Sequence, residues 1–223
     1  MLTSNNIFIS CYLFCIVKDS YIVKQIKNTI ANNWQKERHY LKRKCSTVFS
    51  FGLFDESELI GVCIYGKPAS PALCKGIAGK EESSRVIELT RLFIEDITPK
   101  NTESWFVSRT FKLLKQITDK DIIVSYADTS IGHKGTVYKA LSFIYTGLSD
   151  KHKEWRLKDS LNHSRNIFRG KTLKELKEEY GSRLYQIERP RKHRFIRFNG
   201  SKTRKKLLFK KLKYKPIEYD TTQ

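Results

Sequence analysis

The chain has 223 residues, 39% of them hydrophobic, and carries a formal net charge of +20. This length suits one sizeable core and excludes two large independent domains. Residues 1–150 contain 20 Lys and Arg against 15 Asp and Glu, whereas residues 151–223 contain 23 against 8. Because the positive excess is concentrated in the last third, which lacks a long apolar face for a membrane, we expect a nucleic-acid partner and no membrane.

Cysteine usage indicates a reducing compartment. The chain has 5 Cys, an odd number, and no two of them form a CxxC pair. We therefore expect reduced thiols in a cytoplasmic protein. The apolar run Ile7 to Val17 is too short to cross a bilayer, and we expect it to form a buried strand.

The first third of the chain predicts one helix and one hairpin. Isoleucines recur every four residues between Ser20 and Arg38, which favours an amphipathic helix. Two β-rich runs, Thr47 to Phe54 and Leu59 to Tyr65, flank the polar "DESE" and favour an antiparallel hairpin. The following stretch, Gly66 to Glu82, holds several Gly and Pro and is expected to be a long loop.

The middle of the chain alternates strands and helices. The predicted elements are a strand at Val86 to Ile94, a helix opening at Asn101 or Thr102, a strand at Ile122 to Ala127, a helix at Gly135 to Leu141, and strands at Phe143 to Thr146 and Glu154 to Leu157. This order predicts a mixed α/β sheet with its ligand near the carboxyl ends of the central strands.

The last third predicts a helix, a strand and a basic segment. "TLKELKEEY", Thr172 to Tyr180, has the capping-box pattern of a helix, and "KHRFIRF", Lys192 to Phe198, alternates as a half-exposed strand. "SKTRKKLLFKKLKYK" carries eight Lys or Arg in fifteen residues. We expect a catalytic core over residues 1–158 and a basic C-terminal extension over residues 159–223 that packs on the core and contacts DNA.

Arg91 is a candidate ligand-binding residue. In a regular strand, the period of two would place Ile87, Leu89, Arg91 and Phe93 on one face and Glu88, Thr90, Leu92 and Ile94 on the other. Both faces are mostly apolar, so the guanidinium would be at least partly buried and would require an anion. That anion is either a structural partner, Asp128 or Glu88, or a bound phosphate or carboxylate.

Ser104 lies in the first turn of the helix that follows this strand. Free backbone N–H groups and the helix dipole favour negative charge there, so the Ser104 hydroxyl could position a ligand or relay a proton. Serine is also common near helix starts for capping alone.

The stretch "SYADTSIGHKGTVYKA" gathers further candidates just past a predicted central strand. Asp128 and Tyr138 could form a general acid and base pair, with Gly132 and Gly135 turning the chain between them. The alternative reading is a loop cap for Asp128 and a core position for Tyr138. His133 could be a base, a metal ligand or a solvated loop residue.

Five motifs stand out along the chain: "VIELTRLFIED", "PKNTESWFVSRTFKLL", "DIIVSYADTSIGHKGTVYKALSFIYTG", "NHSRN" and "PRKHRFI". Together they resemble the Mom family of phage DNA-modification proteins. Family members look like relatives of the GNAT acyltransferases, which implies a mostly antiparallel central sheet flanked by helices. The resemblance implies conversion of the exocyclic amino group of adenine in DNA to a methylcarbamoyl type of adduct. Such a protein acts in the host cytoplasm and shields viral DNA from restriction.

The resemblance also implies site residues and cofactors. By motif, the active-site residues are Arg91, Ser104, Asp128 and Tyr138, with Tyr65 as a fifth. Arg91, Phe93, Lys100 and Ser104 would hold acetyl-CoA or a related acyl donor. Where GNAT enzymes have a Gly-rich turn, this chain reads "TPKNTES" without glycine. An iron ion is a further implied cofactor, for which Asp128 and His133 are the candidate ligands.

We expect double-stranded DNA to contact a set of basic residues. They are Lys134, Lys139, Arg165, Lys192, His193, Arg194, Arg197, Lys202, Arg204, Lys205 and Lys206. Two other functions fit the same charge distribution: an N-acyltransferase that acts on protein or RNA, and a non-enzymatic DNA-binding protein on an acyltransferase-like scaffold.

Overall fold

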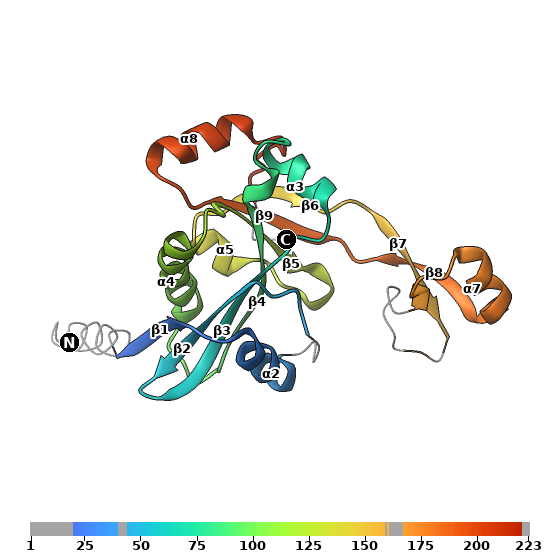
Figure 1. Ribbon diagram of the computed structural model, residues 1–223, viewed down its shortest axis with the longest axis horizontal. Coiled ribbons are helices and arrows are strands. Elements are labelled where there is room, and N and C mark those ends of the chain that lie inside the picture. The colour runs from blue at the N-terminus through green and yellow to red at the C-terminus, as the bar shows by residue number, and fades with distance from the viewer. Residues whose placement is uncertain (1–19, 40–43, 159, 161–166, 220–223) are drawn as a thin grey trace, which may run out of the picture.

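A computed structural model describes residues 20–39, 44–158, 160 and 167–219. Its main feature is a seven-stranded sheet in the order β1-β2-β3-β4-β5-β9-β6 (Figure 1). The strands are β1 (Tyr21–Gln25), β2 (Phe49–Asp55), β3 (Glu58–Gly66), β4 (Val86–Ile94), β5 (Ile122–Asp128), β6 (Ile144–Leu148) and β9 (Lys192–Phe198). All neighbours are antiparallel except β4 and β5. The predicted mixed, mostly antiparallel sheet flanked by helices is therefore confirmed.

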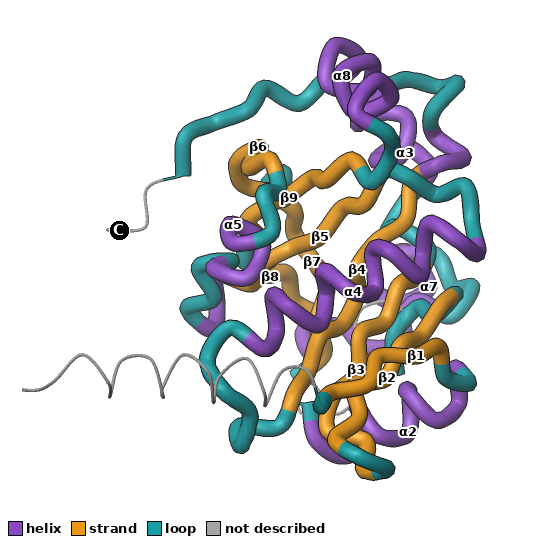
Figure 2. The backbone as a smooth tube through the Cα atoms, turned by 90° about the vertical axis from the view of Figure 1, so that its left-hand side faces the viewer, coloured by secondary structure: helices purple, strands orange, loops and turns teal. Residues whose placement is uncertain are grey.

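Helices cover both faces of this sheet. Helices α4 (Thr102–Ile117) and α5 (Thr136–Ala140) lie on one face, which Figure 2 turns toward the viewer. Helices α2 (Asn28–Arg38), α3 (Pro71–Ala78) and α8 (Lys202–Lys211) pack on the other. Strand β5 shows the cause: its alternate residues Ile123 and Ala127 join the α4 cluster, whereas Ile122 and Val124 join the α3 and α8 cluster.

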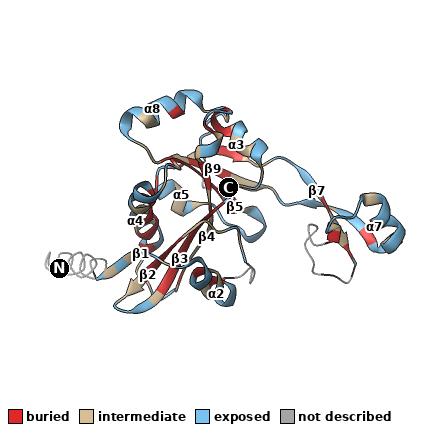
Figure 3. Cartoon of the chain, viewed as in Figure 1, coloured by how far each residue is buried: buried red, intermediate tan, exposed pale blue. Residues whose placement is uncertain are grey.

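A small lobe, residues 152–189, projects from the sheet (Figure 1). It consists of the two-stranded ribbon of β7 (His152–Leu157) and β8 (Leu184–Arg189), with helix α7 (Leu173–Tyr180). The capping box predicted for α7 is present. The lobe has its own apolar cluster, made by Leu157, Ile167, Leu176 and Leu184. Figure 3 shows that most of the rest of the lobe is exposed.

The predicted boundary at residue 158 does not match the sheet. Strand β9 lies between β5 and β6, so residues assigned to a C-terminal extension complete the central sheet. The "KHRFIRF" pattern correctly predicted a strand there. It contains no information about the partner strand, because alternation reports burial and not neighbours.

Two local predictions in the first third were wrong. A strand, β1, precedes α2 where one continuous helix was expected, and Ile22 and Ile30 are 52% and 47% exposed. The expected loop at 66–82 contains α3, which opens with Ser70 accepting a hydrogen bond from the backbone N–H of Leu73 and with Pro71 in the first turn. The strand predicted at residues 7–17 lies outside the described residues.

A bulge in β4 reverses the expected side-chain alternation. The pairing with β3 shifts between Ile64 and Tyr65, which oppose Arg91 and Leu89, so Thr90 is the extra residue. Arg91 therefore lies on the face opposite to Leu89. Its strand neighbour Phe93 packs with the α2 cluster, while Leu89 packs with the α4 cluster. The bulge turns the Arg91 side chain to the α2 side of the sheet.

Candidate active site

The sheet opens at a fork between its two parallel strands. Strands β4 and β5 pair only from Val86 and Ile122 to Leu89 and Ser125. Beyond that point β4 stays with β3 and β5 stays with β9. The Ser125 hydroxyl donates to the Leu89 carbonyl (3.0 Å) at the point of divergence. The inner edges of the two strands then lack a strand partner, which leaves space for a ligand between them.

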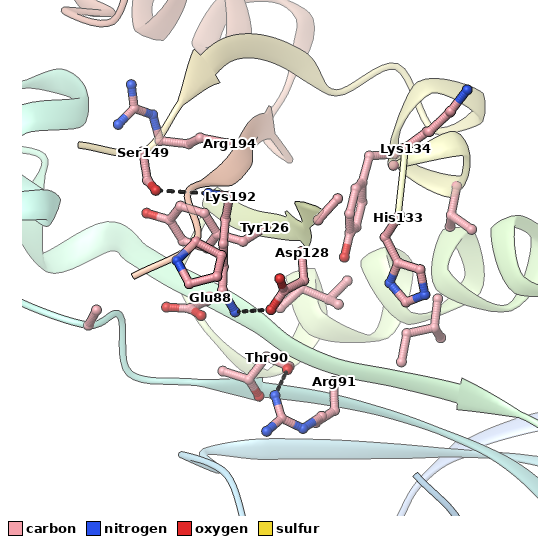
Figure 4. A pocket seen from close by; sticks show the side chains of 18 of the residues that line it. Glu88, Thr90, Arg91, Tyr126, Asp128, His133, Lys134, Ser149, Lys192 and Arg194 are labelled. Atoms are coloured by element: carbon pink, nitrogen blue, oxygen red, sulfur yellow. Dashed lines mark hydrogen bonds and ion pairs between the residues drawn. The ribbon is translucent and has the colours of Figure 1, made fainter. Parts of the chain in front are cut away.

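A cavity of about 960 Å³ occupies this fork (Figure 4). Its walls are the diverging ends of β4 and β5, the turn into α5, the start of α3 and the root of the lobe. Of the residues predicted for catalysis, the cavity brings together Arg91, Asp128 and Tyr138. Its volume is in the range of sites that hold a small molecule or cofactor.

Asp128 ends β5 at the cavity wall. Its carboxylate makes an ion pair with Lys192 (2.9 Å) and accepts hydrogen bonds from the backbone N–H (3.1 Å) and hydroxyl (2.6 Å) of Ser130. Burial alone would raise the pKa of Asp128, but the hydrogen bonds from Ser130 and Lys192 outweigh it and hold this pKa below its usual value. The carboxylate is thus ionised at neutral pH and can accept a hydrogen bond from a ligand.

Arg91 presents an incompletely bonded guanidinium. One terminal nitrogen donates to the Thr90 carbonyl (2.7 Å), as Figure 4 shows. Its Nε is buried and has no hydrogen-bond partner among the described residues. A buried N–H without an acceptor is costly, so this group is suited to an acceptor on a bound ligand. Next to it, Phe93 packs edge-on against Trp34, with ring centroids 5.4 Å apart.

Tyr138 stands on α5 with its ring in an aromatic cluster. Its centroid lies 5.3 Å from that of Phe143 and 5.0 Å from that of Phe195. The ring is thus held rigidly while the residue still lines the cavity. His133 and Lys134 also line it, from the turn before α5, and the Lys134 side chain points away from Asp128 in Figure 4.

Sequence comparison identifies the family. The model of the Mom protein family matches residues 20–219. The chain belongs to the Mom protein family. It is 26% identical over 202 residues to the methylcarbamoylase mom of Escherichia phage Mu, across 87% of this chain and 82% of that protein.

Solved structures similar to this Mom-family chain include two acetyltransferases. One is Arabidopsis thaliana NAA60 in complex with acetyl-CoA, with a TM-score of 0.48 and 11% identity over 81% of this chain and 99% of that one. The other is the ribosomal-protein-S5-alanine acetyltransferase from Vibrio fischeri, with a TM-score of 0.46 and 13% identity over 82% and 94%. Both scores lie below 0.5, and no correspondence between individual residues follows from them.

Tyr65 is a core residue in this Mom-family protein. Its side chain is fully buried, does not line the cavity, and its hydroxyl lies 2.7 Å from the hydroxyl of Thr110 on α4. Burial raises its pKa well above the usual value for tyrosine. The catalytic role implied by the resemblance does not fit this position, because a buried, hydrogen-bonded phenol cannot reach a ligand in the fork.

Ser104 and Lys100 do not line the cavity either. The Ser104 hydroxyl donates to the Asn101 carbonyl (3.0 Å), which is a local helix-start bond, and Lys100 is exposed in the preceding turn. Of the four predicted donor-binding residues, the cavity thus contains Arg91 and Phe93.

Three arginines predicted to contact DNA are engaged inside the protein. Arg194 is buried, donates to the hydroxyl (2.9 Å) and carbonyl (3.1 Å) of Thr146, and stacks on Tyr214. Arg197 donates to the Leu141 carbonyl and lies over the ring of Phe111. The third, Arg204, bonds two acidic side chains of the core. The periodicity of the sequence alone gave no sign of these interaction partners.

The remaining predicted DNA contacts divide by exposure. Lys192 pairs with Asp128 at the cavity, His193 accepts or donates a hydrogen bond with the hydroxyl of Tyr145 (2.9 Å), and Lys139 bonds the carbonyl of Tyr219 (3.2 Å). Lys139 is nevertheless exposed, as are Lys134, Lys202, Lys205 and Lys206. Arg165 lies outside the described residues.

Tyr126 and Glu88 are two of the cavity-wall residues that were not selected from the sequence as site residues. Tyr126 lies two residues before Asp128, and strand alternation in "SYAD" places both on one face, so this signal was available. Burial, with the nearby charge of Glu88, raises the pKa of Tyr126 far above its usual value, so its phenol is a hydrogen-bond donor at neutral pH. Glu88 also lines the cavity; the sequence had suggested it only as a structural anion for a buried Arg91.

The predicted iron site does not fit the described residues. Nowhere in the described part of the chain do three His, Cys, Asp or Glu side chains come together as a ligand set. Asp128 is already bonded to Lys192 and Ser130.

Three cysteines, Cys45, Cys63 and Cys74, are free thiols. None of the described helices has both the length and the apolar composition that crossing a bilayer requires.

Proposed function

We propose that this protein is a phage DNA-modifying transferase that attaches an acyl-type group, of the methylcarbamoyl kind, to the exocyclic N6 amino group of adenine, in the host cytoplasm. Membership of the Mom family supports the substrate. The methylcarbamoylase of Escherichia phage Mu is a relative by 26% identity. The observation that carries the proposal is the fork, where the ionised carboxylate of Asp128 and the incompletely bonded side chain of Arg91 line one cavity.

In this proposal, Asp128 binds the adenine amino group and acts as the general base. Its carboxylate accepts a hydrogen bond from the adenine amino group and takes the proton that leaves when the new N–C bond forms. Lys192 and Ser130 fix the carboxylate and keep it ionised before the reaction. The phenol of Tyr138 donates a proton to the leaving group of the donor, so that the protons balance across the step.

Arg91 and the inner edge of β4 hold the donor. A bound donor supplies an activated acyl carbon. The buried Nε of Arg91 is suited to an anionic or carbonyl oxygen, and the edge of β4 beyond Leu89 offers backbone groups to amides. Acetyl-CoA has both kinds of group. An acetyl group contains no nitrogen, so a carbamoyl adduct requires a nitrogen-containing relative of this donor or a nitrogen-containing co-substrate.

The target base has to leave the duplex. The exocyclic amino group of adenine is paired inside double-stranded DNA, so the enzyme must take the base out of the stack or act on unpaired strands. A cavity of about 960 Å³ accommodates a base beside part of a donor.

Mass spectrometry of DNA nucleosides tests the proposal. The wild-type protein is expressed in a bacterial host beside the variants Asp128→Asn and Tyr138→Phe. We expect a new adenine adduct with wild type and about a 100-fold loss of it with each variant, the size of a general acid or base contribution. Asparagine can keep the hydrogen bond from the Ser130 N–H but loses the ion pair with Lys192, so the Asp128 variant should fold with a slightly lower melting temperature.

Other outcomes identify the rival functions. Modified protein lysines or RNA with unmodified DNA would show an acyltransferase that acts elsewhere. Salt-dependent DNA binding with no change in any nucleoside would show a binding protein. A full adduct level in both folded variants would show that the reaction occurs at another place in the molecule.

A further inference from the structure

The ribbon of the lobe has two chemically different faces. Its register places three pairs on the outer face: His152 opposite Arg189, Glu154 opposite Ile187, and Arg156 opposite Tyr185. The alternate residues Trp155, Leu157 and Leu184 pack toward α7 in the lobe's apolar cluster. The outer face is thus the side of the ribbon that points away from α7.

This outer face is continuous with the cavity. Its first pair, His152 and Arg189, lines the cavity directly. The root of the lobe is also fastened to the loop after Asp128: the Thr129 hydroxyl donates to the Arg191 carbonyl (2.6 Å), and Arg191 donates to the Ser149 carbonyl (2.6 Å). These bonds attach the root of the lobe beside the candidate active site.

The charges on the outer face favour an anion. Arg189 and His152 are exposed. Glu154, the acid on this face, is buried and bonded to Arg156. Tyr185 is 40% exposed and offers an aromatic surface. The α7 side is different, because its exposed Lys174 and Lys177 alternate with Glu175, Glu178 and Glu179.

We propose that the outer face of the lobe ribbon binds the DNA strand that carries the target adenine and delivers that base to the cavity. Basic side chains with an interleaved aromatic match a strand's phosphates and stacked bases. The ribbon strands are 6 residues long, about 20 Å, which matches roughly six nucleotides at the rise of one DNA strand. The inference rests on the proposed function for its substrate and adds the surface that presents it.

The basic helix α8 is less suited to this task. It follows Phe198, which pairs with Ile122 at the start of β5, whereas Lys192 pairs with Asp128 at its end. A strand of 7 residues separates these ends by about 20 Å. Figure 1 also shows α8 and the lobe on opposite sides of the molecule.

Matched double variants of the full-length protein test the inference by fluorescence anisotropy with a labelled duplex that contains adenines. The lobe variant carries Arg189→Gln and Tyr185→Ala. The α8 variant carries Lys210→Gln and Phe209→Ala, which removes one exposed basic and one exposed aromatic side chain, since Phe209 is 54% exposed. We expect DNA affinity to fall about tenfold or more in the lobe variant, and the slope of log affinity against log salt concentration to decrease by about one. In the α8 variant we expect DNA affinity to change less than about twofold.

Equal affinity of the lobe variant and wild type, or a larger loss in the α8 variant, would overturn the inference. Melting curves check that both variants fold, and Arg189→Gln alone should still reduce the salt dependence. Nucleoside mass spectrometry separates the two proposals. An adenine adduct from wild type with unaltered DNA affinity of the lobe variant overturns the lobe inference alone. Weakened binding by the lobe variant with no adduct from wild type overturns the proposed function alone.

Discussion

The two ends of β5 use the same kinds of charged residue to different effect. At its start, Asp121 accepts from Arg85 (2.9 Å) and Arg204 (2.8 Å), and Glu82 beside it accepts from Arg204 and Lys211. Each of these two carboxylates has at least two cationic partners. We call this group of five side chains the charge clamp, because it fastens α8 to the core.

At the other end of β5 the bonding is sparser. Asp128 has one cationic partner, Lys192, and the Nε of Arg91 across the fork has no partner among the described residues. A saturated cluster holds elements together, whereas incompletely bonded groups in a cavity retain the capacity to bind a ligand. We therefore expect charged residues of this chain to bind a ligand only where their partners within the protein are incomplete.

The largest effect on this comparison is expected from Glu82→Gln. Loss of the carboxylate leaves Arg204 and Lys211 with one fewer acceptor, and the free energy of unfolding should fall by about 2 kcal/mol. Urea denaturation measures it, with the exposed Glu58→Gln as control. If the free energy of unfolding falls no more in Glu82→Gln than in the control, the Glu82 carboxylate of the charge clamp does not stabilise the protein.

The same residue sets a pH dependence. Hydrogen bonds from Arg204 and Lys211 lower the pKa of Glu82 from 4.5 to about 2 in the folded protein. Its stabilising contribution is therefore complete above pH 4.5 and is lost as the pH falls toward 2, since the unfolded chain binds the proton first. Wild type should lose more stability than Glu82→Gln over this interval.

A smaller effect is expected from Arg91→Met at the other end. Methionine fills similar space without the guanidinium, so affinity for acetyl-CoA should fall about tenfold while the melting temperature stays unchanged or rises. Calorimetric titration with acetyl-CoA measures the affinity. Arg109→Met, on the exposed side of α4, is the matched control. Undiminished binding by the Arg91 variant would exclude this residue from the donor site.

The smallest effect is expected from Tyr65→Phe. The variant loses the hydrogen bond with Thr110, whose hydroxyl keeps its bond to the Val107 carbonyl (2.8 Å). We expect about 1 kcal/mol less stability and less than about a twofold change in adduct level. A large loss of adduct in a stable Tyr65→Phe protein would restore this residue to the active site.

Local patterns predicted the elements that local physics determines. The capping-box pattern predicted α7, and the alternation of basic with apolar or aromatic residues predicted β9. The same reasoning failed where one residue changes the period. The bulge at Thr90 moved Arg91 to the other face of β4, and no property of "VIELTRLFI" marks the extra residue, because the partner strand creates it.

The candidate site was predicted in part for the same reason. Asp128 and Tyr138 lie within one short stretch, so spacing along the chain was enough to bring them together. Tyr65 and Arg194 were misjudged because their burial depends on α4 and on the segment around Tyr214, which are remote in sequence. Charge counts cannot tell an arginine that meets solvent from one that meets a carbonyl.

The position of β9 has a consequence for biosynthesis. Strand β5 ends at Asp128, but its neighbour begins only at Lys192, after the whole lobe has been translated. Until the ribosome has released Phe198, one edge of β5 is bare and β6 lacks its partner in the sheet. A nascent chain therefore carries an incomplete sheet through most of its synthesis, and its last strand completes the sheet at the same time as it adds its residues to the wall of the candidate active site.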